Sequence, residues 1–69
     1  MKTTRNVKGC YTTFIDGEKI LIEHGSTGWY AFYIGNNLKL DNLLYDVRTY
    51  KTKRELIQNL KAIERLYFS

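Results

Sequence analysis

The residues best suited to nucleophilic chemistry are the single cysteine, Cys10, and the single histidine, His24. Nucleophilic catalysis needs a thiol or hydroxyl within reach of a base that is itself held in orientation. Both residues are expected at the open end of one β-hairpin, where the two strand ends approach each other. The sequence offers no third group to orient the base and no recognisable oxyanion site. We therefore predict that the protein is not an enzyme.

Motifs for metal and cofactor binding are missing from the sequence as well. A closed zinc site needs four Cys, His or carboxylate ligands, and the adjacent Glu23 and His24 are expected to point to opposite faces of a strand. Residues 25–28 contain two glycines but lack the lysine of a phosphate loop and do not open a helix. We expect no metal and no cofactor.

Charge is the most informative property of the chain. The formal net charge of +4 is divided into +3 over residues 1–8, −3 over residues 9–47 and +4 over residues 48–69. Segregated basic segments are the pattern expected of a protein that contacts phosphate, although basic side chains also keep the outer face of a helix solvated. The predicted nucleic-acid contacts are Arg5, Lys8, Arg48, Lys51, Lys53, Arg54, Lys61 and Arg65.

The length of the chain restricts the elements that can position these residues. A chain of 69 residues supports one domain, and a domain this small buries only about 60% of the surface of its unfolded form. One cysteine allows no internal disulfide, which points to a reducing cytoplasm. No apolar run approaches the roughly 20 residues that span a bilayer, so we expect no membrane association.

The first two strands are expected around a glycine turn. Asp16 and Gly17 separate two runs rich in β-branched and aromatic residues, which is a strong hairpin signal. A two-residue turn pairs Ile15 with Glu18, and a glycine bulge shifts that register by one residue and turns the other set of side chains inward. The two-residue register places four side chains on one face: Tyr11, Ile15, Ile20 and Ile22.

Residues 29–34 are apolar or aromatic at every position, as expected of a central strand. One helix covers only one face of a sheet, so either Trp29 and Tyr33 or Tyr30 and Phe32 remain on the open face. We take Trp29 and Tyr33 as the aromatic surface, because Trp and Tyr are enriched at binding hot spots and stack on bases.

Residues 38–50 fit two patterns. Four apolar side chains follow a helical spacing, whereas residues 43–50 alternate as in a strand. We favour a short strand over residues 38–40, then a turn of helix, and an extended approach from Arg48 to Tyr50. The four side chains with helical spacing are Leu40, Leu43, Leu44 and Val47.

The C-terminal helix is the most clearly encoded element. Thr52 and Glu55 match the capping box that opens a helix. Apolar side chains then follow at spacings of four, three and four, which places them on one face: Leu56, Leu60, Ile63 and Tyr67. Polar and basic side chains fall on the opposite side: Arg54, Gln58, Lys61 and Arg65.

Together these elements predict an α+β domain over residues 9–69, in which a small antiparallel meander of three or four strands packs on one C-terminal α-helix. A flexible basic arm over residues 1–8 precedes it. From Gly9 to Leu66, with a helix opening over residues 50–56 (YKTKREL), this plan resembles the small sheet-plus-helix DNA-binding domains of some integrases and plant transcription factors. Those families read the major groove with the sheet, whereas the sheet unit here is net acidic. The short, Tyr- and Asn-rich composition also resembles accessory proteins of phages and other mobile elements.

Two functional hypotheses follow. The first is a small non-enzymatic binding module that contacts nucleic acid, or a nucleic-acid-processing protein, through a basic helix face and an aromatic sheet face. The alternative is a protein-interaction module or small inhibitor that acts through its open sheet face or edge strand, with a homodimer as one form of it.

Overall fold

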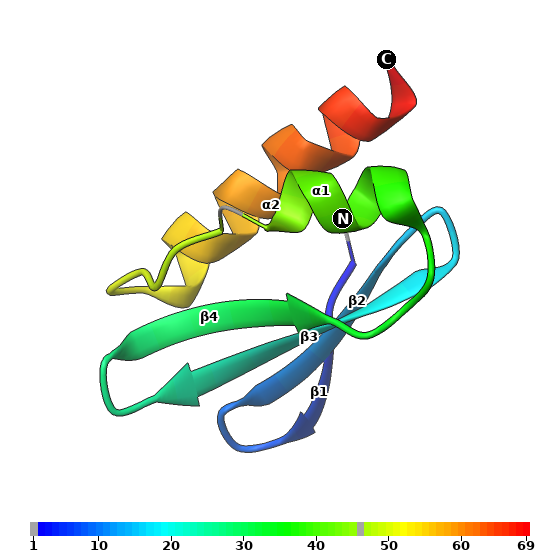
Figure 1. The fold of residues 1–69 in the computed structure, drawn as a ribbon. Helices are drawn as coiled ribbons and strands as arrows, with labels where there is room; N and C mark the ends of the chain where they lie inside the picture. The colour runs from blue at the N-terminus through cyan, green and yellow to red at the C-terminus, as the bar shows by residue number, and fades with distance from the viewer. Residues whose placement is uncertain (1, 46) are drawn as a thin grey trace.

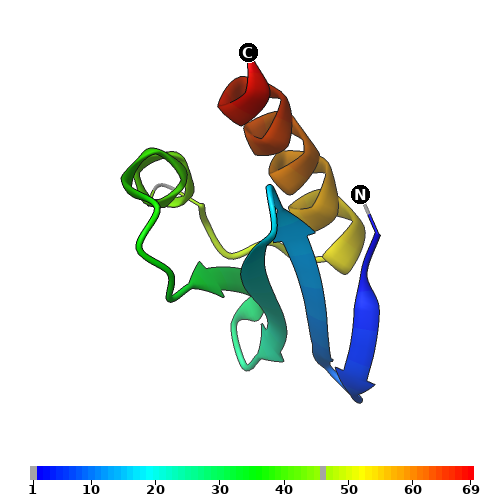
Figure 2. The same cartoon turned by 90° about the vertical axis from the view of Figure 1, so that its right-hand side faces the viewer.

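The computed structural model describes residues 2–45 and 47–69, which form four strands and two helices (Figure 1). The elements are β1 (Thr4–Val7), β2 (Cys10–Ile15), β3 (Glu18–Gly25), β4 (Gly28–Tyr33), α1 (Leu38–Leu44) and α2 (Lys53–Phe68). The strands form one antiparallel sheet in the order β1-β2-β3-β4. Both helices lie on one side of this sheet (Figure 2). The α+β class and the meander are therefore confirmed, with one helix more than predicted.

Residues 1–8, predicted as a flexible basic arm, contain the edge strand β1. Thr4 pairs with Thr12 and Arg5 pairs with Tyr11, and the register shifts before Val7. Every side chain of β1 is exposed, so this strand has no apolar alternation that would reveal it in the sequence. The prediction of a free arm is corrected accordingly, and Arg5 is fixed at the edge of the sheet.

The hairpin of β2 and β3 has the register of a two-residue turn. Ile15 lies opposite Glu18, and the pairing continues without a shift to the far end of β2. Both turn residues, Asp16 and Gly17, have positive φ angles of 52° and 75°. Positive φ at both central positions is the geometry that the twist of a hairpin favours, so this prediction is confirmed.

A small apolar core lies between the sheet and the helices. Each of its side chains contributes on the order of 1.5–3 kcal/mol when fully buried. Tyr11, predicted to face inward with the isoleucines of the hairpin, packs against this core but is only half-buried. The buried apolar residues are Ile15, Ile20, Ile22, Leu40, Leu56, Leu60 and Ile63.

Residues 38–50 begin with a helix, not with the strand that we favoured over residues 38–40. The side-chain oxygen of Asn37 accepts a hydrogen bond from the Leu40 backbone N–H at 3.1 Å and caps α1. This cap, together with the burial of Leu40, selects the helical spacing of the leucines. The extended approach is confirmed at Tyr50, which exchanges two backbone hydrogen bonds with Trp29, at 2.6 and 2.8 Å.

Gly28 makes that approach sterically feasible. Its φ is +134°, and a Cβ at this position would lie 2.5 Å from the carbonyl oxygen of Tyr50. Only glycine tolerates both the backbone conformation and the contact. Gly28 therefore lets Tyr50 pair with Trp29, and this pairing sets where α2 begins relative to the sheet.

The helix α2 begins where the capping box predicts. The hydroxyl oxygen of Thr52 accepts a hydrogen bond from the Glu55 backbone N–H at 3.2 Å. Leu56, Leu60 and Ile63 are buried, so the predicted apolar face is confirmed. Among the described residues, neither helix has the length and apolar content needed to cross a membrane.

Candidate nucleic-acid interface

Six of the predicted basic residues gather at one end of the molecule, which we call the basic end. The turn between β1 and β2, the turn between β3 and β4 and the start of α2 all lie there (Figure 1). All of these basic side chains are exposed except that of Lys53, which is half-buried. The basic end consists of Arg5, Lys8, Arg48, Lys51, Lys53 and Arg54.

Tyr11 connects the start of α2 to the edge of the sheet. The Nζ atom of Lys53 lies 3.9 Å from the centroid of the Tyr11 ring, which is a cation–π contact. Arg5 lies directly across from Tyr11 on β1, and opposed residues in a sheet share a face. Tyr11 therefore contacts Lys53 and shares a face of the sheet with Arg5, and these two cations come from distant parts of the chain.

His24 and Trp29 form a stacked aromatic pair beside this cluster. Their ring centroids are 4.5 Å apart and the ring planes differ by 6°. Trp29 also lies 6.0 Å from Tyr11, centroid to centroid. His24 is exposed whereas Trp29 is half-buried, so the stack presents the imidazole to solvent. The His24 backbone N–H donates to the Gly9 carbonyl oxygen at 2.9 Å, which joins the end of β3 to the turn between β1 and β2.

The aromatic surface does not lie where the sequence placed it. Trp29 and Tyr33 flank Ala31, which pairs with the buried Ile22, so alternation puts all three on the helix-covered face. Both aromatic rings pack against the core. The prediction that Trp29 and Tyr33 form an open-face surface is therefore wrong. The open face carries the other pair that the sequence allowed, Tyr30 and Phe32.

Lys61 and Arg65 do not join the basic end. Both side chains are exposed on α2, as the helical spacing predicts. At a rise of 1.5 Å per residue, Arg65 lies about 16 Å along the helix from Arg54. These two cations form a separate stretch of the helix surface.

The pairing of Cys10 with His24 that we considered for catalysis does not form. Cys10 lies across from Glu23, and His24 is the next residue on the same strand. Neighbouring strand residues point to opposite faces, so the thiol and the imidazole lie on opposite sides of the sheet. Within residues 2–45 and 47–69, no group of three or more His, Cys, Asp and Glu side chains is arranged to hold a metal ion.

Two residues beside the basic end, Tyr11 and His24, were missed at the sequence level. Tyr11 was expected only as an inward-facing hairpin residue, and His24 only as a candidate base. The alternation of β2 already places Tyr11 on the face that the helix covers. No local signal shows that Lys53 reaches its ring, because that contact depends on the distant pairing of Tyr50 with Trp29.

The opposite end of the molecule is held together by tyrosine hydroxyls, which we call the tyrosine network. Tyr67 donates a hydrogen bond to Asp16 at 2.8 Å and accepts one from the Asn37 side chain at 2.7 Å. Tyr33 donates to Glu18 and accepts from the Asn37 backbone N–H at 2.9 Å. The network ties the end of α2 and the start of α1 to the hairpin turn, which is a structural role.

These contacts raise the pKa of both tyrosines. The hydrogen bond donated to Asp16 is the main cause of the raised pKa of Tyr67. Partial burial, followed by the hydrogen bond donated to Glu18, raises the pKa of Tyr33. An ionised phenolate has no proton to donate and is repelled by the facing carboxylate, so the neutral hydroxyl is favoured in the folded state.

We expect the tyrosine network to make stability sensitive to alkaline pH. A raised folded-state pKa contributes stability that is fully present below the unfolded value of about 10 and is lost as pH rises through the folded value. In urea denaturation, the double variant Tyr33→Phe/Tyr67→Phe should therefore lose less stability than the wild type between about pH 9 and pH 11. Tyr45→Phe, at a position 85% exposed, is the control and should follow the wild type. Equal losses in the double variant and the wild type contradict this role.

Comparison of the chain with known protein families, with curated proteins and with solved structures finds no match. What is established is a small α+β domain with one antiparallel meander of four strands and two helices.

Proposed function

We propose that the protein is a non-enzymatic nucleic-acid-binding module that contacts the phosphate backbone through the basic end. The observation that carries this proposal is the meeting at Tyr11 of two cations from distant parts of the chain, because Lys53 of α2 contacts the Tyr11 ring and Arg5 of β1 lies across from Tyr11 on the same face. Cations that serve only solubility have no reason to converge from distant parts of the chain.

The first turn of α2 adds to the attraction for anions. The backbone N–H groups at the start of a helix carry a partial positive charge, and Lys51 and Arg54 lie next to this helix start in the sequence. Contacts from lysine, arginine and helix termini to phosphate supply affinity without reading sequence. The basic end therefore suits binding that depends on the backbone and not on a particular base sequence.

The stack of His24 on Trp29 favours a single strand over a duplex. An unpaired base beside a basic surface can stack on an exposed aromatic ring, and such contacts are worth about 1–3 kcal/mol per base. The imidazole of His24 is exposed, and one face of its ring stacks on Trp29. A reducing cytoplasm, expected from the single cysteine, is where such a module would meet its ligand.

Fluorescence anisotropy with a labelled oligonucleotide, single-stranded or annealed to its complement, tests this proposal. We expect tighter binding to the single strand and a steep dependence on salt. Five phosphate contacts would weaken single-strand binding about 100-fold between 50 and 200 mM salt, because bound counterions are released on association. Binding that is absent at low salt, or that is unchanged when salt rises, rejects phosphate recognition.

A further inference from the structure

The side of the sheet away from the helices carries an uncovered apolar surface, which we call the open face. Phe14 is 53% exposed and Phe32 is 36% exposed. The Phe32 ring lies 6.2 Å from that of Tyr30, centroid to centroid. Contiguous apolar surface of this kind marks an interaction site on a small protein. The exposed and half-buried side chains of β2, β3 and β4 on the open face are Cys10, Phe14, Lys19, Leu21, Glu23, Tyr30 and Phe32, whereas Thr12 on the same side is buried.

Two opposite charges flank the centre of the open face at equal spacing. Lys19 and Glu23 each lie two residues from Leu21 on β3, and alternation puts all three on the same face. Consider a two-fold axis that passes over Leu21, parallel to the plane of the sheet and perpendicular to the strands. Rotation about this axis places β3 of a second copy over β3 of the first with its two ends exchanged. Such an axis brings Lys19 of one copy opposite Glu23 of the other, which is the self-complementarity that a symmetric dimer requires.

The same rotation matches large side chains with small ones. Phe14 lies across from Lys19, and Cys10 lies across from Glu23. When the ends of the strands are exchanged, the bulky ring of Phe14 faces the small side chain of Cys10 in the second copy. Leu21 and its neighbour Phe32 lie near the axis and meet their own counterparts.

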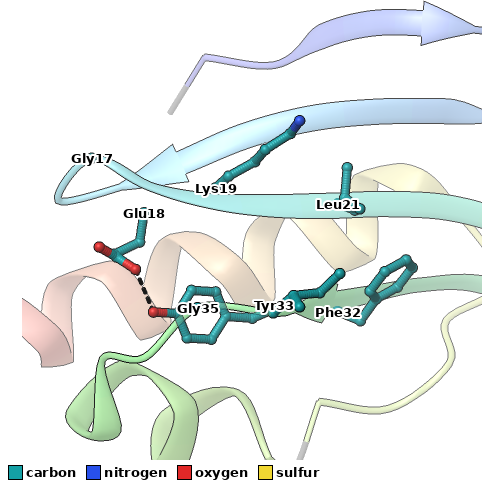
Figure 3. Close-up of a pocket in the computed structure, with 8 residues that line it drawn as sticks. Gly17, Glu18, Lys19, Leu21, Phe32, Tyr33 and Gly35 are labelled. Atoms are coloured by element: carbon teal, nitrogen blue, oxygen red, sulfur yellow. Dashed lines mark hydrogen bonds between the residues drawn. The ribbon is translucent and has the colours of Figure 1, made fainter.

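A hollow on this face accepts the remaining large side chain. It has a volume of about 330 Å³ and its lining includes Lys19, Leu21, Phe32 and Ile34 (Figure 3). The rotation carries Tyr30 of the second copy, which lies across from Glu23, over this hollow. Tyr30 donates a hydrogen bond to Glu23 at 3.0 Å, which links the two side chains. In the dimer the Tyr30 ring of one copy therefore faces the hollow of the other, while the linked Glu23 carboxylate faces Lys19 of that copy.

We propose that the open face is a self-association surface, on which two copies of the chain pack with their sheets face to face. A stable interface buries about 800 Å² per partner, which is about one sixth of the 4963 Å² of accessible surface of this chain. The face carries one charge of each sign at its centre, which favours a second copy over a strongly acidic or basic ligand. This inference does not depend on nucleic-acid binding, because the helices and the start of α2 remain outside the contact.

Exchange of the two charges tests the proposed axis. We expect sedimentation equilibrium to show a dimer of the wild-type chain, and the single variants Lys19→Glu and Glu23→Lys to dissociate at least about tenfold more readily, since like charges then face each other. The double variant Lys19→Glu/Glu23→Lys should restore the wild-type dimer. Lys61→Glu on the exposed side of α2 makes the same charge change as Lys19→Glu and should leave dimerisation unchanged.

Three results overturn the inference. The first is a wild-type chain that stays monomeric at protein concentrations up to about 1 mM, because its dissociation constant then lies above the millimolar range. The second is a dimer for which the double variant is no better than the two single variants. The third is a dimer that survives Leu21→Lys, because a charge at the axis cannot be accommodated. Circular dichroism of each variant separates loss of association from loss of folding.

Discussion

Replacing Leu60 with alanine is expected to lower the free energy of unfolding by about 2–5 kcal/mol. The Leu60 side chain is completely buried, and among residues 2–45 and 47–69 seven apolar residues form the buried core. A domain of this length has a total stability of about 3–10 kcal/mol, at roughly 0.05–0.15 kcal/mol per residue. A single truncation therefore removes a large share of the stability, and part of the population should be unfolded without denaturant.

Urea denaturation followed by far-UV circular dichroism measures this loss. Leu66→Ala is the matched control, because it makes the same chemical change on the same helix at a side chain that is 59% exposed. Exposed positions away from special features change stability by no more than about 0.5 kcal/mol. Equal losses at the two positions would show that α2 does not pack on the sheet through Leu60.

The elements that were predicted correctly are those whose local signal and burial agree. Asp16 and Gly17 fix the turn chemistry of the β2–β3 hairpin, and the alternation of its flanks agrees with the side that is buried. Thr52 and the spacing of the leucines do the same for α2. Where the turn residues, the helix cap and the apolar spacing all indicate the same element, the prediction from sequence is correct. The folded structure is stabilised by the same local features that the prediction uses.

The elements that were missed depend on contacts distant in the sequence. β1 buries no side chain and is held by backbone pairing to β2, so nothing in residues 4–7 alternates. In α1 the leucines fit both periods, and the cap at Asn37 decides between them. An exposed edge strand and a short helix are therefore the places where pattern alone is insufficient.

The candidate interface was predicted in its composition but not in its arrangement. The basic residues are visible in the sequence, yet their gathering depends on Gly28, whose missing side chain lets Tyr50 reach Trp29. Lys61 and Arg65 lie about two to three turns farther along α2 than Arg54, away from this pairing. The face occupied by Trp29 follows from the register of β4 against β3, which the sequence left open.

Reversing two charges at the basic end is expected to weaken single-strand binding at least about 100-fold. It should also reduce the slope of log K against log salt concentration by about 1.4 in magnitude, which corresponds to two lost phosphate contacts. The change is the double variant Lys51→Glu/Arg54→Glu. Both side chains are exposed, so folding should be preserved. Fluorescence anisotropy at two salt concentrations measures both quantities.

The matched control is Lys61→Glu/Arg65→Glu, which alters the net charge by the same amount at two exposed positions farther along α2. If attraction came only from the overall charge, the two double variants would weaken binding equally. If the phosphates lie against the first turn of α2, the second pair acts from about 10–16 Å away, at or beyond a Debye length at physiological salt. The control should then lose only a few-fold in affinity at that salt, and a loss as large as that of the first pair contradicts a localised interface.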